Sequence, residues 1–441
     1  MAKKTKLQTP VGMADILPED QKYFKKIYET VSNIADFYGF AKIDTPIVEN
    51  TEVFEKGTGI STDIVKKEMY TFKTKGGDSL TLRPEGTPAI VRSYIENGMQ
   101  SWPQPVKLWY FGPYFRYEHS QSGRYRQFWQ FGFETFGENG PVIDSQIIQI
   151  FYNILKDLKL KNLVVEVNSI GDSQCRPYYK KLLANYFKTR ESSLCVDCKR
   201  RVKENVLRIL DCKEEKCQPI KTEAPQILDH LCDECRLHFK GVLEFLDEIE
   251  IPYRLNPYLV RGLDYYTKTV FEIAPLEEKS EKNDDAENSA SVMPVKNLTL
   301  AGGGRYDKLA KLLGGKDTPG CGGAAGIERI IMAMKKQGIK IEESKNIPVF
   351  LAQIGDFAKR KSLKLLDEFR RAKIGVAESF GRDSLKAQLN RADKLGARYT
   401  LIIGQKEALE NTIIIRNMEN GKQEIVKLEK TVEKVKEMLK R

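Results

Sequence analysis

The sequence predicts an α+β protein, with an antiparallel β-sheet core that is interrupted by a mainly helical module and followed by a separate α/β domain. Three observations indicate this architecture. Two aromatic-rich, β-prone runs at 106–116 and 128–136 flank a polar, basic loop and predict an antiparallel hairpin. A cysteine-rich stretch at 172–245 contains no long β-like run. From residue 347 onward, strand-like and helix-like segments alternate, which is typical of a compact α/β domain.

The first part of the core is expected to span residues 1–171 of the 441-residue chain. Residues 20–38 carry apolar side chains at helical spacing, and a short β-like stretch that contains Pro46 follows. Because proline cannot donate to a strand ladder, this stretch is expected at a sheet edge or at an interface. After the aromatic hairpin, residues 143–158 show a second helical pattern and residues 163–169 are strand-like.

The second part of the core is expected over residues 246–336, after the inserted module at 172–245. It begins with a β-rich stretch, and the segment 276–297, which is poor in large apolar residues, is predicted to be a mobile loop. A strand that breaks at glycines, at 298–309, and a glycine-rich entry into a helix, at 320–334, complete the core. The final domain, 347–441, is predicted to follow the order β-α-β-α-β-β-β-α.

Composition limits the class of protein. Hydrophobic residues make up 41% of the chain, which is enough to bury sizeable cores. No run of about 18 apolar residues occurs, so no membrane span is predicted, and the N-terminus lacks the apolar stretch of a secretory signal, which favours a cytoplasmic protein. The net charge of +11 indicates either a polyanionic partner or a generally lysine-rich composition.

The hairpin carries the side chains that most clearly suggest chemistry. Phe128, Gln130 and Glu134 share one face of the return strand, because alternate residues of a strand point the same way. A buried carboxylate among aromatic residues needs a partner. Arg116 and Arg124, on the first strand and in the loop, suit phosphates through their forked donors. A structural salt-bridge network on the sheet is the alternative.

Two further segments and one helix carry similar residues. In the segment 81–92, Glu85 and Thr87 can present oxygens to one cation such as an α-amino group, although Thr87 could simply cap a helix. The segment LVRGLDYY (259–266) combines arginine, aspartate and tyrosines after a β-rich run, where ordinary strand residues are equally expected. Arg329, near the start of a predicted helix, could meet a phosphate.

In this order the motifs resemble the histidyl-tRNA synthetase family of class II aminoacyl-tRNA synthetases. The motifs are RPEGT (83–87), FRYE (115–118), GRYRQFWQFGFE (123–134), LVRGLDYY (259–266), GGRYD (303–307), GIER (326–329) and, for an anticodon-binding domain, LKAQLNRADKLGARYTLIIGQKE (385–407). RGLDYY and GGRYD are specific to the histidine enzymes, whereas FRxE and GxER are only class-specific. The resemblance covers essentially the whole chain. It implies a class II antiparallel-sheet core with a helical insertion and a C-terminal anticodon-binding domain.

The resemblance implies a reaction in which histidine and ATP give histidyl-adenylate and pyrophosphate, after which the histidyl group passes to tRNA-His. Arg261 matches the catalytic cation of the family, and Arg116 matches the arginine on the substrate carboxylate and the α-phosphate. Mg²⁺ is the expected metal on the β- and γ-phosphates. The other implied ATP contacts are Glu118 and Phe128 for adenine, and Arg124 and Arg329 for phosphates.

For the amino acid, the resemblance implies that Glu85, Thr87 and Gln130 bind the α-amino group. Glu134 and Tyr266 would bind the imidazole, since a carboxylate and a phenol can engage its two nitrogens. A site that needs both partners can reject analogues without editing. The implied pocket consists of Glu85, Gly86, Thr87, Arg116, Gln130, Glu134, Arg261, Tyr265 and Tyr266.

The resemblance also implies partners and leaves two alternatives. tRNA-His is the expected nucleic acid, with Gln121 near its extra 5′ guanosine, and a homodimer is expected with the segment around Pro46 at the two-fold interface. One alternative is a synthetase-like histidine sensor, which typically lacks the anticodon domain and the equivalents of Arg261 and Arg329. The other is a class II enzyme for a different amino acid, against which Glu134 and RGLDYY argue.

Seven of the eight cysteines lie in the inserted module. In a cytosolic chain, two C-x₂-C pairs suggest one zinc ion held by four thiolates rather than disulfides, and reduced, unligated thiols are the alternative. Cys212-x₄-Cys217 lies between the pairs, and His230 and His238 could replace a cysteine ligand. The family does not generally require zinc. The predicted ligands are Cys195, Cys198, Cys232 and Cys235.

Overall fold

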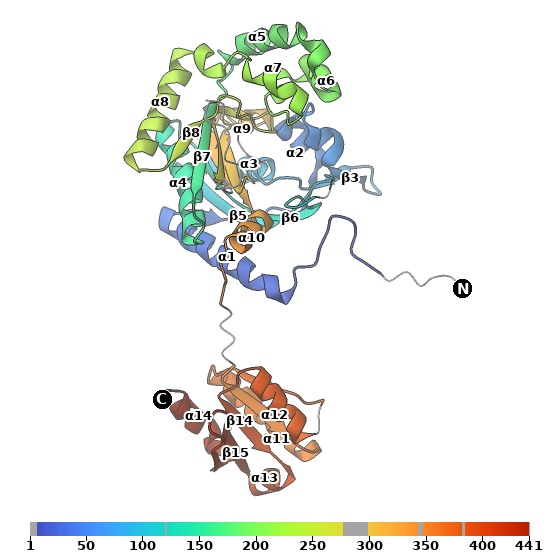
Figure 1. Ribbon diagram of the computed structural model, residues 1–441, viewed down its shortest axis with the longest axis vertical. Helices are drawn as coiled ribbons and strands as arrows, with labels where there is room; N and C mark the ends of the chain where they lie inside the picture. Colours follow the sequence, from blue (N-terminus) through green and yellow to red (C-terminus); the bar gives the residue numbers. More distant parts are fainter. Residues whose placement is uncertain (1–6, 120, 277–298, 343–346, 382–383, 441) are drawn as a thin grey trace, which may run out of the picture. The chain divides into compact units, whose positions relative to one another are not determined.

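The computed structural model describes residues 7–119, 121–276, 299–342, 347–381 and 384–440 (Figure 1). The chain divides into two compact units, Met1–Ile341 and Glu342–Arg441, and each is described by itself below. Apart from Leu276, the segment 276–297 that was predicted to be a mobile loop lies outside the described residues. In the described part of the chain, no helix is both long enough and apolar enough to span a membrane.

The larger unit is built on a sheet that has eight strands among its described residues, in the order β1-β5-β6-β11-β10-β9-β7-β8. The outer pairs β1–β5 and β7–β8 are parallel and all other neighbours are antiparallel, which confirms the predicted sheet core. The strands are β1 (Ala41–Lys42), β5 (Val106–Phe115), β6 (Gln127–Phe136), β7 (Leu163–Ser169), β8 (Tyr253–Leu255), β9 (Thr267–Pro275), β10 (Ala301–Arg305) and β11 (Gly320–Gly326).

The predicted hairpin is confirmed, and its two faces have different roles. β5 and β6 pair along their whole length. Phe131 and Phe133 of β6 are fully buried in an apolar core that includes residues of α1 (Pro18–Tyr38), α4 (Pro141–Asp157) and α10 (Ile327–Lys336). Because side chains alternate along a strand, Gln130 and Glu134 lie on the other face of β6, where the candidate site forms.

The glycine-rich residues 320–326 lead directly into a helix, as predicted, but they themselves form strand β11, which the sequence did not predict. β11 lies between β6 and β10, and α10 begins only at Ile327. A Cβ atom on Gly322 would lie 1.8 Å from Glu134 Oε2, and one on Gly303 of β10 would lie 2.1 Å from the Gly322 carbonyl oxygen. Glycine is weak in strands, but here close approach of neighbouring groups requires it.

The remaining elements of the larger unit lie around this sheet (Figure 1). Between β7 and β8 the described chain forms helices but no strand, as the sequence predicted for the inserted module. Before β5, a small sheet of β2, β4 and β3 accompanies two short π-helical turns, Glu55–Gly59 and Ile64–Glu68. The bounds are β2 (Val48–Asn50), β3 (Tyr70–Lys73), β4 (Ser79–Leu82), α2 (Thr51–Phe54), α3 (Thr87–Glu96), α5 (Arg176–Lys188), α6 (Val196–Glu204), α7 (Gln218–Thr222), α8 (Asp233–Glu248) and α9 (Leu309–Leu312).

The smaller unit confirms the predicted α/β domain. Its sheet has the order β13-β12-β14-β15-β16. The short helix α13 (Gln405–Glu410) was not predicted, because so few residues cannot display an apolar stripe; the Glu407 carboxylate caps it by accepting the Gly404 N–H at 2.9 Å. The other elements are β12 (Val349–Gln353), β13 (Val376–Glu378), β14 (Tyr399–Ile403), β15 (Thr412–Asn417), β16 (Gln423–Lys427), α11 (Asp356–Arg371), α12 (Leu385–Lys394) and α14 (Thr431–Lys440).

Candidate active site

A cavity of about 560 Å³ opens in the larger unit beside β6, β10 and β11. Its lining includes residues from the hairpin, from the segment before β9 and from the start of α10, which are far apart in the sequence. Seven of the residues predicted for the site line it, namely Arg116, Glu118, Arg124, Phe128, Gln130, Arg261 and Arg329.

The arginines from the hairpin surround an acidic residue. The Arg116 Nε donates to the Pro84 carbonyl at 2.8 Å, and its guanidinium lies 5.4 Å from the centre of the Phe128 ring. Glu118 lies between two arginines, with Oε1 3.7 Å from Arg116 Nη1 and Oε2 3.5 Å from Arg124 Nη1. One carboxylate therefore bridges two guanidinium groups on this side of the cavity.

Arg329 lies close to the same two arginines, Arg116 and Arg124. Its Nε donates to the Gly123 carbonyl at 2.9 Å and its Nη1 to the Thr299 carbonyl at 3.2 Å. Burial lowers the pKa of Arg329, and the nearby guanidinium groups of Arg124 and Arg116 lower it further. Arginine nevertheless stays charged in proteins. Mutual repulsion of this kind is relieved when a polyanion binds between the guanidinium groups.

Arg261 lies at the same cavity with a partner that the sequence did not reveal. It forms an ion pair with Glu272 of β9, and its guanidinium lies 6.0 Å from the centre of the Tyr266 ring. The buried Arg261 Nε has no hydrogen-bond partner among the described residues. Because a buried N–H needs an acceptor, this donor is available to a ligand oxygen. The signal for Glu272 was a single acidic residue inside the apolar strand TVFEIA.

Glu134 belongs to a second, buried group of site residues. Its Oε1 accepts from the Thr87 hydroxyl at 2.6 Å, and its Oε2 accepts from the Tyr306 hydroxyl. Burial raises the pKa of Glu134 to about 8, although the hydrogen bonds from Thr87 and Tyr306 favour the ionised form. None of the ion pairs formed by the described residues involves Glu134. A buried acid without a protein cation is suited to a ligand that brings its own N–H groups.

Glu85 has a similar environment. Its Oε2 accepts from the Tyr265 hydroxyl at 2.8 Å, and its Oε1 accepts from the Thr58 hydroxyl. Burial raises the pKa of Glu85, opposed by the Thr58 hydrogen bond and then by the charge of Arg116. The structure therefore brings together Glu85, Thr87, Glu134 and Tyr265, four residues predicted for one pocket.

Two tyrosines for which the sequence indicated no role also belong to this buried group. Tyr306 follows β10 and reaches Glu134 across β11. Tyr110 of β5 lies opposite Gly132 of β6, and its buried hydroxyl has no hydrogen-bond partner among the described residues. A Cβ atom on Gly132 would lie 2.4 Å from that hydroxyl. In the sequence, Tyr110 could have been found as the tyrosine that pairs with Gly132 in the predicted aromatic hairpin.

The remaining predicted residues lie near these groups or outside them. Tyr266 packs against Tyr265 with ring centres 4.6 Å apart and lines a smaller cavity of about 170 Å³. Gly86 is buried immediately before α3, and the Thr87 hydroxyl binds Glu134 instead of capping that helix. Gln121 is exposed in the hairpin loop, where it exchanges backbone hydrogen bonds with Arg124.

The structure corrects the predicted zinc ligands. Cys195 and Cys198 lie with Cys212 and Cys217, whereas Cys232 and Cys235 lie with Asp172 and Cys175; in each group the possible ligand atoms are within 4.8 Å of one another. A set that combines both C-x₂-C pairs is therefore wrong, because the pairs begin different helices, α6 and α8. The histidines join neither group, since His238 binds Asp144 and His230 packs against Tyr178 and Tyr179.

Asp144 of α4 is a further buried acid, and it has a cationic partner. Arg305 Nη2 donates to Asp144 Oδ2 at 2.6 Å, and His238 Nε2 lies 3.3 Å from Oδ1. Burial alone would raise the pKa of Asp144, but Arg305 and His238 outweigh burial and hold the pKa below its ordinary value. This acid is neutralised within the protein.

Comparisons with known proteins agree with this geometry. Residues 12–330 match the sequence model of the family described as histidyl-tRNA synthetase, and residues 348–438 match that of an anticodon-binding domain. The chain belongs to the histidyl-tRNA synthetase family. The resemblance inferred from the motifs is thereby confirmed.

Similar proteins match over nearly the whole chain. The histidine–tRNA ligase of Dehalococcoides mccartyi is 42% identical over 432 residues, which cover 98% of this chain and 100% of that protein. The histidine–tRNA ligase of Acetivibrio thermocellus is 44% identical over 429 residues, which cover 97% and 99%. The crystal structure of apo S. aureus histidyl-tRNA synthetase is similar with a TM-score of 0.77 at 37% identity, covering 97% of this chain and 99% of that chain.

Proposed function

We propose that the protein activates histidine with ATP as histidyl-adenylate and transfers the histidyl group to tRNA-His, releasing AMP and pyrophosphate. The observation that carries this proposal is one arrangement: a cavity lined by arginines beside a buried pair of acids, Glu85 and Glu134, that have hydroxyl partners. The first part suits a triphosphate and the second suits the two nitrogen-bearing ends of histidine. A histidine sensor would not need the arginines that suit phosphates.

In the proposed complex, Glu85, Thr87 and Gln130 bind the α-ammonium group of histidine. Glu134 accepts an imidazole N–H, and Tyr266 engages the other side of the ring. Support comes from the environment of Glu134, whose pKa of about 8 reflects burial without a protein cation. An imidazole N–H supplies the missing donor, so binding of histidine should lower the pKa of Glu134.

At the other end of the cavity, Arg116 and Arg261 hold the histidine carboxylate and the α-phosphate together. A carboxylate oxygen attacks the α-phosphorus in line and pyrophosphate leaves, so catalysis consists mainly of positioning and charge stabilisation. The free Arg261 Nε supports its assignment as the catalytic cation. The other proposed contacts are Phe128 and Glu118 with adenine, and Arg124 and Arg329 with the β- and γ-phosphates.

The residues present fit Mg²⁺ as a companion of ATP. Mg²⁺ prefers oxygen ligands and usually takes only one or two carboxylates in addition to phosphates. Glu272 and Glu328 line the cavity, but both Glu328 oxygens already accept the Trp129 N–H, at 2.9 and 3.0 Å. Glu272 is also engaged, with Arg261 on Oε1 and the Thr299 hydroxyl on Oε2 at 2.8 Å, so either glutamate would exchange a partner to hold the ion. When bound, Mg²⁺ would neutralise charge on the pyrophosphate leaving group.

The other assignments follow from the same function. We place Gln121 and the C-terminal domain at the tRNA, and we place the protein in the cytoplasm, which is supported by its eight unpaired cysteines. We also propose a homodimer with the segment around Pro46 at its interface. The neighbouring Ile47 and Val48 are 42% and 38% exposed, which supports an apolar contact there.

The test is ATP–pyrophosphate exchange with each amino acid, followed by charging of tRNA-His. Histidine should drive exchange best, and Arg261→Ala should reduce exchange by at least about 10³-fold while histidine and ATP still bind. Arg254→Ala, which changes an exposed arginine on β8, is the matched control and should keep wild-type exchange. Exchange driven by no amino acid, or best by proline or threonine, would refute the proposal, and wild-type exchange in Arg261→Ala would refute the role of that residue.

A further inference from the structure

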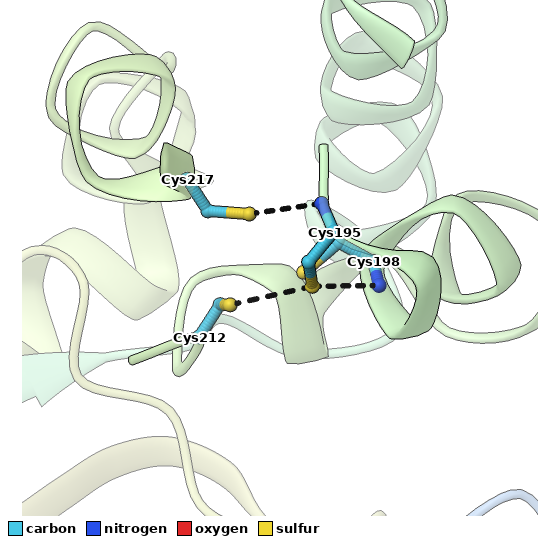
Figure 2. Close-up of side chains that lie close together, drawn as sticks. All are labelled: Cys195, Cys198, Cys212 and Cys217. Carbon is cyan, nitrogen blue, oxygen red and sulfur yellow. Dashed lines mark hydrogen bonds between the residues drawn. The ribbon is translucent and has the colours of Figure 1, made fainter. Parts of the chain in front are cut away.

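The inserted module contains four cysteines that the proposed reaction does not use. The sulfurs of Cys195, Cys198, Cys212 and Cys217 lie within 4.8 Å of one another (Figure 2). Cys195 Sγ and Cys212 Sγ are 3.9 Å apart. Four sulfurs around a tetrahedral zinc ion, with bonds of about 2.3 Å, are about 3.8 Å from each other. Small side-chain adjustments would therefore enclose one ion.

The backbone around these sulfurs also suits a metal. The Cys198 N–H donates to Cys195 Sγ at 3.4 Å, and the Cys195 N–H donates to Cys217 Sγ at 3.2 Å (Figure 2). N–H donors favour the thiolate form, which is the form that binds metal. Cys195-x₂-Cys198 at the start of α6 and Cys212-x₄-Cys217 both have spacings seen in structural zinc sites.

The second group, Asp172 with Cys175, Cys232 and Cys235, is already satisfied without an ion. Asp172 Oδ1 accepts the Gln174 N–H at 2.8 Å and the Cys175 N–H at 3.4 Å. The thiols of Cys175 and Cys232 are directed at the same oxygen, at 3.6 and 4.0 Å. These contacts form a turn that leads into α5, with thiols as weak donors. We therefore assign the ion to the group of four cysteines.

The chain between the two cysteine pairs, residues 199–211, contacts the residues of the catalytic cavity. Arg201 and Arg208 line that cavity and both bind Asp63, at 3.1 and 3.4 Å. Asn205 Nδ2 donates to Asp264 Oδ1 at 2.9 Å. Asp264 belongs to the segment that carries Arg261 and Tyr265. Fixing both ends of residues 199–211 would thus fix one wall of the cavity.

We propose that Cys195, Cys198, Cys212 and Cys217 bind one zinc ion as thiolates and that this ion holds residues 199–211 as a wall of the catalytic cavity. Four thiolates close the coordination sphere, so the ion has a structural role and leaves no position for substrate. Binding of the ion would displace the thiol protons and stabilise the fold of this segment. Zinc binding does not depend on the proposed function, whereas the effect of the ion on the catalytic cavity rests on that function.

The first test is the zinc content of the full chain purified without chelator. The wild type should contain zinc, and Cys212→Ser should contain about one zinc per chain less. Cys232→Ser, which changes a partly exposed cysteine of the second group, is the matched control and should keep the wild-type content. Wild-type protein with less than about 0.2 zinc per chain would overturn the proposal, as would a Cys212→Ser protein that keeps the wild-type content.

A second measurement covers the case in which Cys212→Ser does not fold. The wild-type chain is exchanged with Co²⁺, and its visible and near-ultraviolet absorption is recorded. Four thiolates should give the intense visible bands of tetrahedral Co²⁺ and thiolate-to-metal charge transfer for one site. A spectrum of an octahedral or oxygen-rich site would overturn the proposed ligand set.

The effect on the cavity needs its own readout. Removal of zinc should raise the KM for ATP or histidine in exchange and should accelerate tryptic cleavage within residues 199–211. Unchanged KM values and unchanged cleavage would refute the positioning role. If neither the zinc-loaded nor the zinc-free form shows exchange, the proposed function fails, while zinc content and the Co²⁺ spectrum still test the metal site.

Discussion

Glu134 and Asp144 are both fully buried acids of the larger unit, but their partners differ. Asp144 binds the guanidinium of Arg305, whereas Glu134 binds the hydroxyls of Thr87 and Tyr306. The two acids depend on consecutive residues, because Arg305 and Tyr306 follow each other in the GGRYD motif. An acid neutralised within the protein stabilises the fold, and an acid without a cation is left for a ligand.

The two acids also have opposite effects on the pH dependence of stability. Arg305 and His238 hold the pKa of Asp144 below its ordinary value, against the effect of burial. Ionised Asp144 therefore stabilises the fold at pH values above its ordinary pKa, and this stabilisation is lost as pH falls through the lowered pKa. Burial raises the pKa of Glu134 from 4.5 to about 8, so stability is greatest below pH 4.5 and decreases as pH rises toward 8. Four experiments test this difference between the two acids.

The largest effect is expected from Arg305→Met, which leaves Asp144 buried without its cation. The free energy of unfolding should fall by about 3–5 kcal/mol, since an unpaired buried charge is costly. Urea denaturation followed by circular dichroism measures it. Arg236→Met, which changes an arginine with a side chain 68% exposed, should cost little. Equal losses in the two variants would contradict the structural role of the Arg305–Asp144 pair.

Glu134→Gln should have the next largest effect, on substrate recognition. Glutamine keeps the shape and can still bond to both hydroxyls, but it has no charge to offer the imidazole. We expect kcat/KM for histidine in ATP–pyrophosphate exchange to fall by about 10–10²-fold, as for loss of a charged hydrogen bond, with little change in the KM for ATP. Glu248→Gln, at the exposed end of α8, serves as control. Unchanged histidine kinetics would show that Glu134 does not contact the substrate.

The same Glu134→Gln variant should change the pH dependence of stability. Between pH 6 and pH 9 the wild type must ionise Glu134 in its buried site, whereas glutamine does not titrate. The variant should therefore gain about 2.5 kcal/mol relative to the wild type over this range. Parallel urea titrations at the two pH values measure the gain. A stability difference that does not vary with pH would mean that the pKa of Glu134 is not raised.

The smallest effect is expected from Tyr306→Phe, which removes one hydroxyl donor from Glu134. Loss of one hydrogen bond to a charged acceptor is worth about 1–2 kcal/mol, so histidine affinity should fall by about 5–30-fold. Isothermal titration calorimetry measures this affinity. Tyr178→Phe, at a ring that is 62% exposed, is the matched control. Wild-type affinity in Tyr306→Phe would show that the Tyr306 hydroxyl does not contribute to histidine binding.

The sequence predicted the strand face on which Glu134 lies but not the partners that distinguish it from Asp144. Alternation along β6 correctly placed Gln130 and Glu134 on one face, because the period of a strand is local information. The partner of Glu134 was not predictable in this way. Tyr306 reaches Glu134 because β11 lies between β6 and β10, and that order follows from the assembled sheet.

The strand at the glycine-rich stretch was missed, and the cysteine ligand set was predicted wrongly, also because long-range packing cannot be read from local sequence. The glycine-rich stretch 320–326 was predicted only as the entry into a helix, although close packing against Glu134 and β10 makes it a strand. The two C-x₂-C pairs look alike in sequence, yet they begin helices that lead their sulfurs to different partners. Motif spacing is local information, whereas the sets that the cysteines form depend on how distant parts of the chain fold against one another.

Strand β11 has a consequence for redesign of the pocket. It supplies main-chain hydrogen bonds to both neighbours but almost no side-chain bulk where Tyr306 crosses it; a methyl group on Gly320 would lie 2.4 Å from the Tyr306 ring. The room for the amino acid thus depends on Gly320 and Gly322, which have no side chain that a substitution could shorten. Acceptance of a bulkier substrate would have to come from shortening Tyr110 or Tyr306, with the loss of a hydroxyl each time.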